Sequence, residues 1–341
     1  MNPKQLAARI GQAVVVLVVT YTVAFLLLSA LPSDAVMSRF GDPALGLSEA
    51  EIAAIREEMG VDKPLVVQFF TGLAGALVGD FGNSTQTGAK VGTLIADAAP
   101  HTLALAASSI GLAILVALLV AFLATLPGLG FISAFFRGLP SFMVSLPGFW
   151  IGILLIQFFS FQLGWIRIIE PSSFEGLILP TLTLAVPMAA PLIQVLIRSI
   201  DETQAMPFVQ AVRSRGASEA WIFWRDILRN SLLPALTMAG LLFGELVGGA
   251  VVTETVFGRT GLGQMTAQAV SNRDTPVLLA IVLIAAAAYV AINLIVDLLY
   301  PVLDVRLRAP RTRSTSPQAA ADHVSARVTA PAAELEEGPR A

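Results

Sequence analysis

The chain has 341 residues, of which 55% are hydrophobic and only 13% charged, whereas about a quarter of the residues of a soluble domain are charged. This composition excludes an ordinary soluble protein and indicates a membrane protein. Cysteine is absent, which excludes a disulfide framework and a thiolate metal site. The net charge of −3 says little about partners, because the distribution of charge matters more than its sum.

Charge-free runs locate the membrane-spanning segments, because about 20 apolar residues cross a hydrocarbon core roughly 30 Å thick. The runs are 10–33, 98–136, 138–166, 176–197, 231–244 and 275–296. We interpret the second and third as a helical hairpin, separated by Arg137 and by the breaker LPGLG. The sequence therefore predicts an all-α polytopic membrane protein whose six transmembrane helices lie at about 10–32, 102–126, 138–162, 176–199, 231–253 and 276–302.

The basic residues orient these helices. With residues 1–9 in the cytoplasm, most lysines and arginines outside the spans fall on the inner side, as the positive-inside rule requires. We therefore expect a multi-pass protein of the inner (cytoplasmic) cell membrane with both termini in the cytoplasm. The membrane domain is expected at 10–308, and the polar, Ala- and Pro-rich segment 309–341 as a disordered cytoplasmic tail.

The first external loop, 33–97, is long and net acidic. Within it, SEAEIAAIREEMG predicts a short helix capped by Ser48, since serine accepts a hydrogen bond from a free N–H of the first turn. Apolar residues that include Phe69 and Phe70 follow this helix. The pattern favours a structured cap on the outer face over a loose linker.

The usual marks of an enzyme are missing from the sequence. His101 and His323 are the only histidines, so a Ser/His pair or a histidine zinc site has no support. No phosphate-cradling Walker loop occurs, so we expect the chain not to bind ATP by itself. We predict no catalytic residue and no metal site.

Glu245 lies fourteen residues into the fifth run, about 20 Å from its inner start and hence within the bilayer. A carboxylate at that depth is costly, and it either faces a water-filled path or a polar partner helix, or is a protonated or hydrogen-bonded packing residue. Together with Gln194 and Asn293, it forms the set that we predict for a translocation pathway.

The polar segment QAVRSRGASEAWIFWRDILRNSLLP, residues 210–234, lies between the fourth and fifth runs. FVQAVRSR predicts two helical turns, Gly216 permits a sharp reversal, and SEAWIFWRDILRN predicts a second helix capped by Ser218. Pro234 is expected near the first turn of the next span, where its missing N–H costs little. The tryptophans suit the membrane interface, and the arginines suit acidic lipid or a protein partner.

The spacing Q-A-V-x-x-x-G from Gln210 to Gly216 resembles the E-A-A-x-x-x-G element of ABC importer permeases. Leu233-Pro234 closes it in the longer spacing of the oligopeptide and dipeptide (and nickel) family. Gln210 replaces the usual leading glutamate, and Val212 replaces an alanine.

Further blocks along about residues 8–308 are similar to the same family. They are LLLSALPSDA at 26–35, MGVDKPLVVQFF at 59–70, GDFGNS at 79–84, SLPGFWIGILL from Ser145, LILPTLTLAVPMAAPLIQVLIRS from Leu177 and ETVFGRTGLGQMTAQAVSNRDTPV from Glu254. Any one block is weak evidence for the family, but six blocks in the family's order are a specific resemblance. The long loop after the first span is similar to the first-permease (B-type) subfamily.

The resemblance implies a type I ABC importer permease fold and a subunit without its own ATPase site. The implied partners are a homologous second permease, two ABC ATPase subunits that bind ATP and magnesium, an external solute-binding protein and membrane lipid, and no nucleic acid. This chain itself is expected to bind no cofactor. The implied cargo is di- or oligopeptides, with nickel or another solute as the alternative in the family, and a stand-alone ion-coupled carrier as the alternative outside it.

In the family, the cytoplasmic loop at 200–230 forms the coupling helix that docks on an ATPase. The residues implied for coupling are Gln210, Ala211, Arg213, Arg215, Gly216, Arg225, Arg229 and Pro234. The arginines are candidates for ion pairs with ATPase carboxylates or for contacts with anionic lipid. The residues implied for docking of the binding protein are Phe69, Phe70, Gly261, Arg273 and Asp274.

Overall fold

The computed structural model describes residues 3–30, 48–58, 63–126, 130–172 and 174–303. The tail expected at 309–341 and part of the loop expected at 33–97 lie outside these ranges. Every regular element within the described residues is a helix, apart from one isolated antiparallel bridge between Asn83 and Lys90. The prediction of an all-α protein is confirmed.

Five described helices are long and apolar enough to cross a membrane. Four are α1 (Pro3–Ser29), α5 (Val91–Thr125), α8 (Glu175–Gln204) and α13 (Thr275–Leu303), and the fifth is the continuous helix Glu219–Phe257. The fifth contains α10 (Glu219–Ile222), the π-helical turn η3 (Phe223–Ile227) and α11 (Leu228–Phe257). It therefore begins twelve residues before the predicted start at 231.

The third predicted span, 138–162, is not a straight helix. The structure has α6 (Gly130–Ser145) and then α7 (Gly148–Leu155), which runs into the π-helical turn η2 (Ile156–Gln162), with a bend of 98° between the two parts. Pro147 caps α7 with extended backbone angles, and a proline disfavours helical geometry in the residue before it. The described helices therefore make six spans only if this bent pair counts as one.

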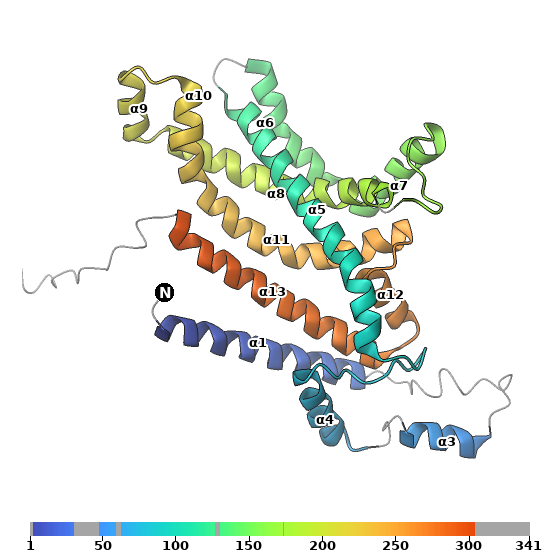
Figure 1. The fold of residues 1–341 in the computed structure, drawn as a ribbon. Helices are drawn as coiled ribbons and strands as arrows, with labels where there is room; N and C mark the ends of the chain where they lie inside the picture. The colour runs from blue at the N-terminus through green and yellow to red at the C-terminus, as the bar shows by residue number, and fades with distance from the viewer. Residues whose placement is uncertain (1–2, 31–47, 59–62, 127–129, 173, 304–341) are drawn as a thin grey trace, which may run out of the picture.

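The core lies where α5, α8 and α11 pack together, and α8 is its central element (Figure 1). In the most apolar stretch of α8, 61% of the residues are buried, against 11% in α1 and in α13. Small residues such as Ala113, Ala117 and Ala189 are completely or almost completely buried at these contacts. Small side chains allow close approach of helices in a membrane, where packing supplies much of the association energy.

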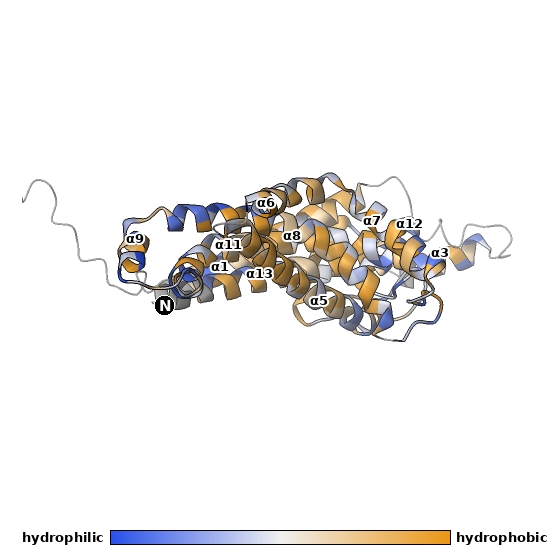
Figure 2. Ribbon diagram, turned by 90° about the horizontal axis from the view of Figure 1, so that it is seen from above, coloured by the Kyte–Doolittle hydropathy of each residue, from blue (hydrophilic) through white to orange (hydrophobic). Residues whose placement is uncertain are grey.

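Two opposite ends of the molecule carry the polar segments. Figure 1 shows α9 (Pro207–Ser214) and α10 at one end, with the start of α1 and the end of α13, which we call the α9 end. The other end, which we call the α12 end, carries α3 (Glu49–Glu58), α4 (Leu65–Leu77) and α12 (Leu262–Ser271). Hydrophobic residues dominate the region between them, and hydrophilic ones gather at the ends (Figure 2).

The packing of α12 on α11 depends on a glycine. A Cβ added at Gly263 would lie 2.7 Å from the Cα of Val251, 2.8 Å from its nitrogen and 2.9 Å from the carbonyl carbon of Ala250. All three are backbone atoms, so no side-chain rotation relieves the overlap. Any larger residue must push the two helices apart.

We expect Gly263→Ala to lower the stability of the protein by about 1 to 3 kcal/mol, as overpacking does elsewhere. The matched control is Gly111→Ala in α5, where an added Cβ meets nothing within 4 Å and alanine favours the helix by about 1 kcal/mol. Thermal unfolding in detergent, followed by circular dichroism, measures both. Equal melting temperatures for the two variants would contradict the proposed contact.

Candidate functional site

The segment between α8 and α11 is anchored by buried apolar residues. The structure forms the predicted helix, turn and helix: α9 starts at Pro207, and α10 starts after Ser218, whose hydroxyl accepts a hydrogen bond of 3.3 Å from the N–H of Trp221. Val209 in α9 and Ile222 in α10 have no exposed surface, and both belong to the main core. Gln210 and Ala211 are exposed on α9.

Gly216 makes the turn that separates the two helices. Its φ of +85° lies in the left-handed region that side chains with a Cβ avoid. Across this turn, Arg213 donates two hydrogen bonds to Glu219, of 2.6 and 2.8 Å, and this pairing raises the pKa of the Arg213 guanidinium. Arg213, expected to face an ATPase carboxylate or lipid, is thus paired within the chain and braces the turn.

The other arginines of the segment differ in their surroundings. The Arg225 guanidinium lies 5.3 Å from the ring centroid of Trp221, within the range of a cation–π contact. Arg215 and Arg229 are exposed, and neither forms an ion pair with another residue of the described ranges. Arg215, beside the glycine turn, is therefore a free cation at the tip of the segment.

Pro234 lies inside α11 and not in its first turn, because the helix already begins at Glu219. Two side chains just before it donate to backbone carbonyls in the widened part of the helix. The Asn230 amide donates to the carbonyl of Asp226 at 2.7 Å, and the Ser231 hydroxyl donates to that of Ile227 at 2.9 Å. Both donors serve carbonyls of the π-helical turn, whereas the missing N–H of Pro234 leaves free the carbonyl four residues before it, that of Asn230.

The three pathway candidates are distributed over three helices. Glu245 on α11 and Gln194 on α8 are exposed, whereas Asn293 on α13 is partly buried and donates to the Tyr289 carbonyl at 2.9 Å. Glu245 has no ion pair within the described residues. An exposed carboxylate in the middle of a membrane helix requires water or a polar partner.

The docking candidates at the α12 end divide into exposed and buried residues. Phe70 is 62% exposed, and Arg273 is exposed with a φ of +57°. Phe69 packs against Tyr21 and Phe25 of α1.

Asp274 and Gly261 are buried, which corrects the expectation that they lie on a docking surface. The carboxylate of Asp274 accepts hydrogen bonds from the Ser84 hydroxyl and, at 3.2 Å, from the Thr85 N–H. Asp274 therefore ties the loop before α5 to the start of α13.

Glu254 is a buried carboxylate that the sequence reasoning did not single out. It has no exposed surface, and it accepts hydrogen bonds from the Thr102 hydroxyl (2.7 Å) and from the N–H groups of Gly263 (2.7 Å) and Gln264 (3.1 Å). It thus caps the N-terminus of α12 from α11, and a Cβ at Gly261 would overlap it. A glutamate shortly before the glycine-rich turn GRTGLG was the available signal.

Comparisons with known proteins agree with this arrangement. Residues 129–309 match the family model described as binding-protein-dependent transport system inner membrane component, and residues 4–106 match the model of the N-terminal part of such components.

The groups of His, Asp and Glu in the described residues include none that could hold a metal ion.

Curated relatives match over most of their length. The glutathione transport system permease protein GsiC of Salmonella paratyphi A is 34% identical over 273 residues, which is 79% of this chain and 89% of that protein. The probable peptide ABC transporter permease protein y4tP of Sinorhizobium fredii is 34% identical over 292 residues, 83% of this chain and 92% of that protein. Among solved structures, a chain of the inward-facing MetNI methionine ABC transporter matches with a TM-score of 0.49 and 20% identity, covering 62% of this chain and 96% of that chain.

The Glu254 cap can be tested with a matched pair of variants. Glu254→Gln places an amide among the donors Thr102, Gly263 and Gln264, and the loss of charge-assisted hydrogen bonds should cost about 1.5 to 3 kcal/mol. Glu245→Gln is the same change on the same helix at an exposed position, and we expect little effect on stability. Thermal unfolding in detergent measures both, and a Glu254→Gln variant as stable as Glu245→Gln would show that the cap contributes nothing.

Proposed function

This chain belongs to the family of binding-protein-dependent transport system inner membrane components, and we propose that it forms half of the pathway by which an ATP-driven importer moves peptides across the cell membrane. As a member of the family it is a membrane-integral permease subunit of an ABC transporter. The proposal that the cargo is a peptide rests on relatives that match most of the chain. One is named a glutathione transport permease and another a probable peptide transporter permease.

The proposed assembly contains a homologous second permease, two ATPase subunits and an external solute-binding protein. ATP and magnesium bind to the ATPases, and this chain acts as the part that they move. Few residues of α1 and α13 are buried within the single chain, which supports the presence of further protein or lipid around these helices. We place the α9 end in the cytoplasm, since it carries Arg213, Arg215, Arg225 and Arg229 together with both ends of the membrane domain.

The coupling role of α9 and α10 is supported by the combination of an exposed turn between them with residues that are buried in the core. Arg213 and Glu219 hold the turn at Gly216, while Arg215 remains free for an acidic partner. Val209 and Ile222 are buried in the core that also contains residues of α5 and α8. A force on the exposed tip therefore reaches the membrane helices through packed side chains, and an ATPase with different affinity for two arrangements shifts the balance between them.

We propose that Glu245 and Gln194 face the aqueous pathway between the two permeases and that Asn293 lies near it. The exposure of Glu245 and Gln194 supports this role, because neither side chain suits a lipid-facing surface. At the opposite end, the exposed side chains of Phe70 and Arg273 are the proposed contacts of the binding protein.

Reconstitution tests the proposed function. The complex of this chain with its second permease and ATPases, in liposomes with the binding protein present, should take up a labelled peptide only when ATP is supplied. A strain without the gene is grown on defined peptides and, for comparison, under conditions in which growth depends on nickel. The condition in which growth is lost identifies the class of solute. Uptake by this chain alone in ATP-free liposomes would show an ion-coupled carrier and overturn the proposal.

The coupling segment is tested by Gly216→Val and by Arg215→Glu. Valine disfavours the positive φ of Gly216, and the charge reversal repels an acidic partner of Arg215. We expect uptake to fall about tenfold, within the usual range of coupling free energies, while ATP hydrolysis persists and the protein stays in the membrane. Lys90→Glu reverses an exposed charge at the α12 end and is the control. Normal uptake and normal stimulated hydrolysis in both variants would exclude coupling through this turn.

A further inference from the structure

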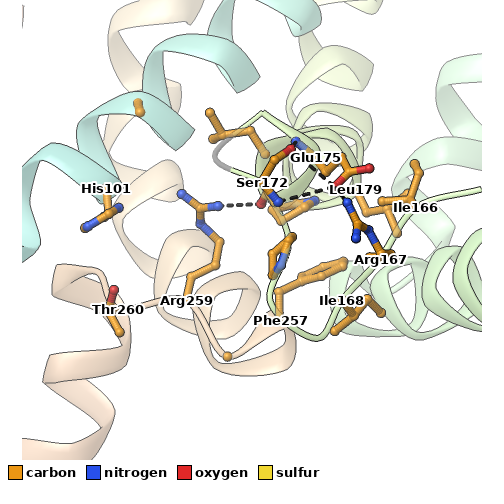
Figure 3. Close-up of a pocket in the computed structure, with 16 residues that line it drawn as sticks. His101, Ile166, Arg167, Ile168, Ser172, Glu175, Leu179, Phe257, Arg259 and Thr260 are labelled. Carbon is orange, nitrogen blue, oxygen red and sulfur yellow. Dashed lines mark hydrogen bonds and ion pairs between the residues drawn. The ribbon is translucent and has the colours of Figure 1, made fainter.

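A cavity of about 400 Å³ opens at the α12 end, among the outer part of α5, the segment before α8 and the turn between α11 and α12 (Figure 3). This volume lies in the range of small-molecule sites. Its walls combine apolar side chains, among them Leu179 and Phe257, with charged ones. The charged and titratable side chains of the lining are His101, Arg167, Glu175 and Arg259.

Arg259 has a buried polar atom without a hydrogen-bond partner. It donates one hydrogen bond to the carbonyl of Gly176, whereas its Nε is buried and has no hydrogen-bond partner. Desolvation lowers the pKa of this guanidinium, and the charge of Glu254 opposes the shift. The Glu254 carboxylate is already occupied by Thr102, Gly263 and Gln264. Figure 3 shows Arg259 between His101 and Ser172, beside the hollow.

The other carboxylate of the lining, Glu175, is engaged away from Arg259. Glu175 accepts hydrogen bonds of 3.2 Å from the N–H and the hydroxyl of Ser172, and it pairs with Arg167 at 3.4 Å. Two arginines against one glutamate leave a formal balance of +1 among the side chains of the lining. Glu254 lies outside the lining but its charge also acts on Arg259, so the formal sum with this carboxylate is zero. Because Glu254 is held by its own donors, the two guanidiniums of the lining are the charged groups that an anionic ligand in the cavity can meet.

We propose that this cavity binds the free carboxylate of a peptide at the outer mouth of the pathway, with Arg259 as the main contact and Arg167 as the second. The inference rests on the proposed function, because a peptide carries one free carboxylate at its C-terminal end, next to polar and apolar groups. The apolar wall then accepts the adjoining side chain. A guanidinium fork matches the planar geometry of a carboxylate, which lysine does not.

The charge of the cavity is measurable without transport, because the chain contains no cysteine. Thr260 lines the cavity and is exposed, so Thr260→Cys introduces a single thiol into this chain of the complex. The measured quantity is its rate of reaction with an anionic and with a cationic methanethiosulfonate reagent, followed by the mass of this chain. We expect Arg259→Gln to lower the ratio of anionic to cationic rates by about 25-fold, because a unit charge about 4 Å away in water changes each rate about fivefold, in opposite directions for the two reagents.

Two further variants keep this measurement decisive. Arg167→Gln changes a side chain that is 71% exposed, so it should preserve the fold even if Arg259→Gln does not, and it should lower the ratio as well. Lys90→Gln removes an exposed charge at the same end but outside the cavity lining, and it should leave the ratio unchanged. An equal effect of Lys90→Gln, or no effect of either arginine, would overturn the proposal.

Ligand binding is tested with alanyl-alanyl-phenylalanine and its C-terminal amide, applied to the complex without the binding protein. The free acid should slow the reaction of Thr260→Cys, the amide should not, and Arg259→Gln should abolish the protection while Arg259→Lys weakens it. Equal protection by both peptides, or none, would overturn the carboxylate site. Protection that appears only when the binding protein is added, without peptide, would instead assign the cavity to an acidic side chain of that protein. ATP-dependent peptide uptake with no protection leaves the proposed function intact while the cavity proposal fails.

Discussion

The buried carboxylate of Glu254 is the constraint on which the α12 end depends. It accepts hydrogen bonds from Thr102 of α5 and from the first free N–H groups of α12, and the Thr102 hydroxyl in turn accepts the N–H of Leu262 at 2.7 Å. A buried carboxylate without these donors would be strongly unfavourable. The three elements must therefore keep their mutual positions, and the turn between α11 and α12 places Arg259 at the cavity.

One helix joins this cap to the opposite end of the molecule. Residues Glu219–Phe257 form a continuous helix of 39 residues, about 58 Å long. Its first turn pairs with Arg213 across the Gly216 turn, and its last turns carry Glu254. The segment that we propose to dock an ATPase and the cap at the proposed outer mouth thus belong to a single element, which also carries Glu245 between them. In the proposed assembly, this single helix would link movement of the ATPase to the shape of the mouth.

Local patterns predicted a large part of this structure. Charge-free runs located the apolar helices because burial in lipid requires them, and Gly216 and Ser218 predicted the turn and the cap because both act within a few residues of the chain. The predictions were wrong at two prolines, whose effect on the helix differs between the two places. Pro147 breaks the third run although the run is free of charged residues throughout, whereas Pro234 is accommodated inside α11, just after a π-helical turn.

The sequence by itself determined the class of the protein, the number and approximate place of its apolar segments, and the helix-turn-helix at the α9 end. Only the tertiary structure decided what the charged residues do, because their partners are distant in the chain. Glu254 meets a residue 152 positions away, and Asp274 meets one 190 positions away. No local spacing encodes such pairs, since they exist only once α5, α11 and α12 have packed. The same holds for Arg259, whose unsatisfied guanidinium becomes a candidate contact only beside Gly176 and the cavity.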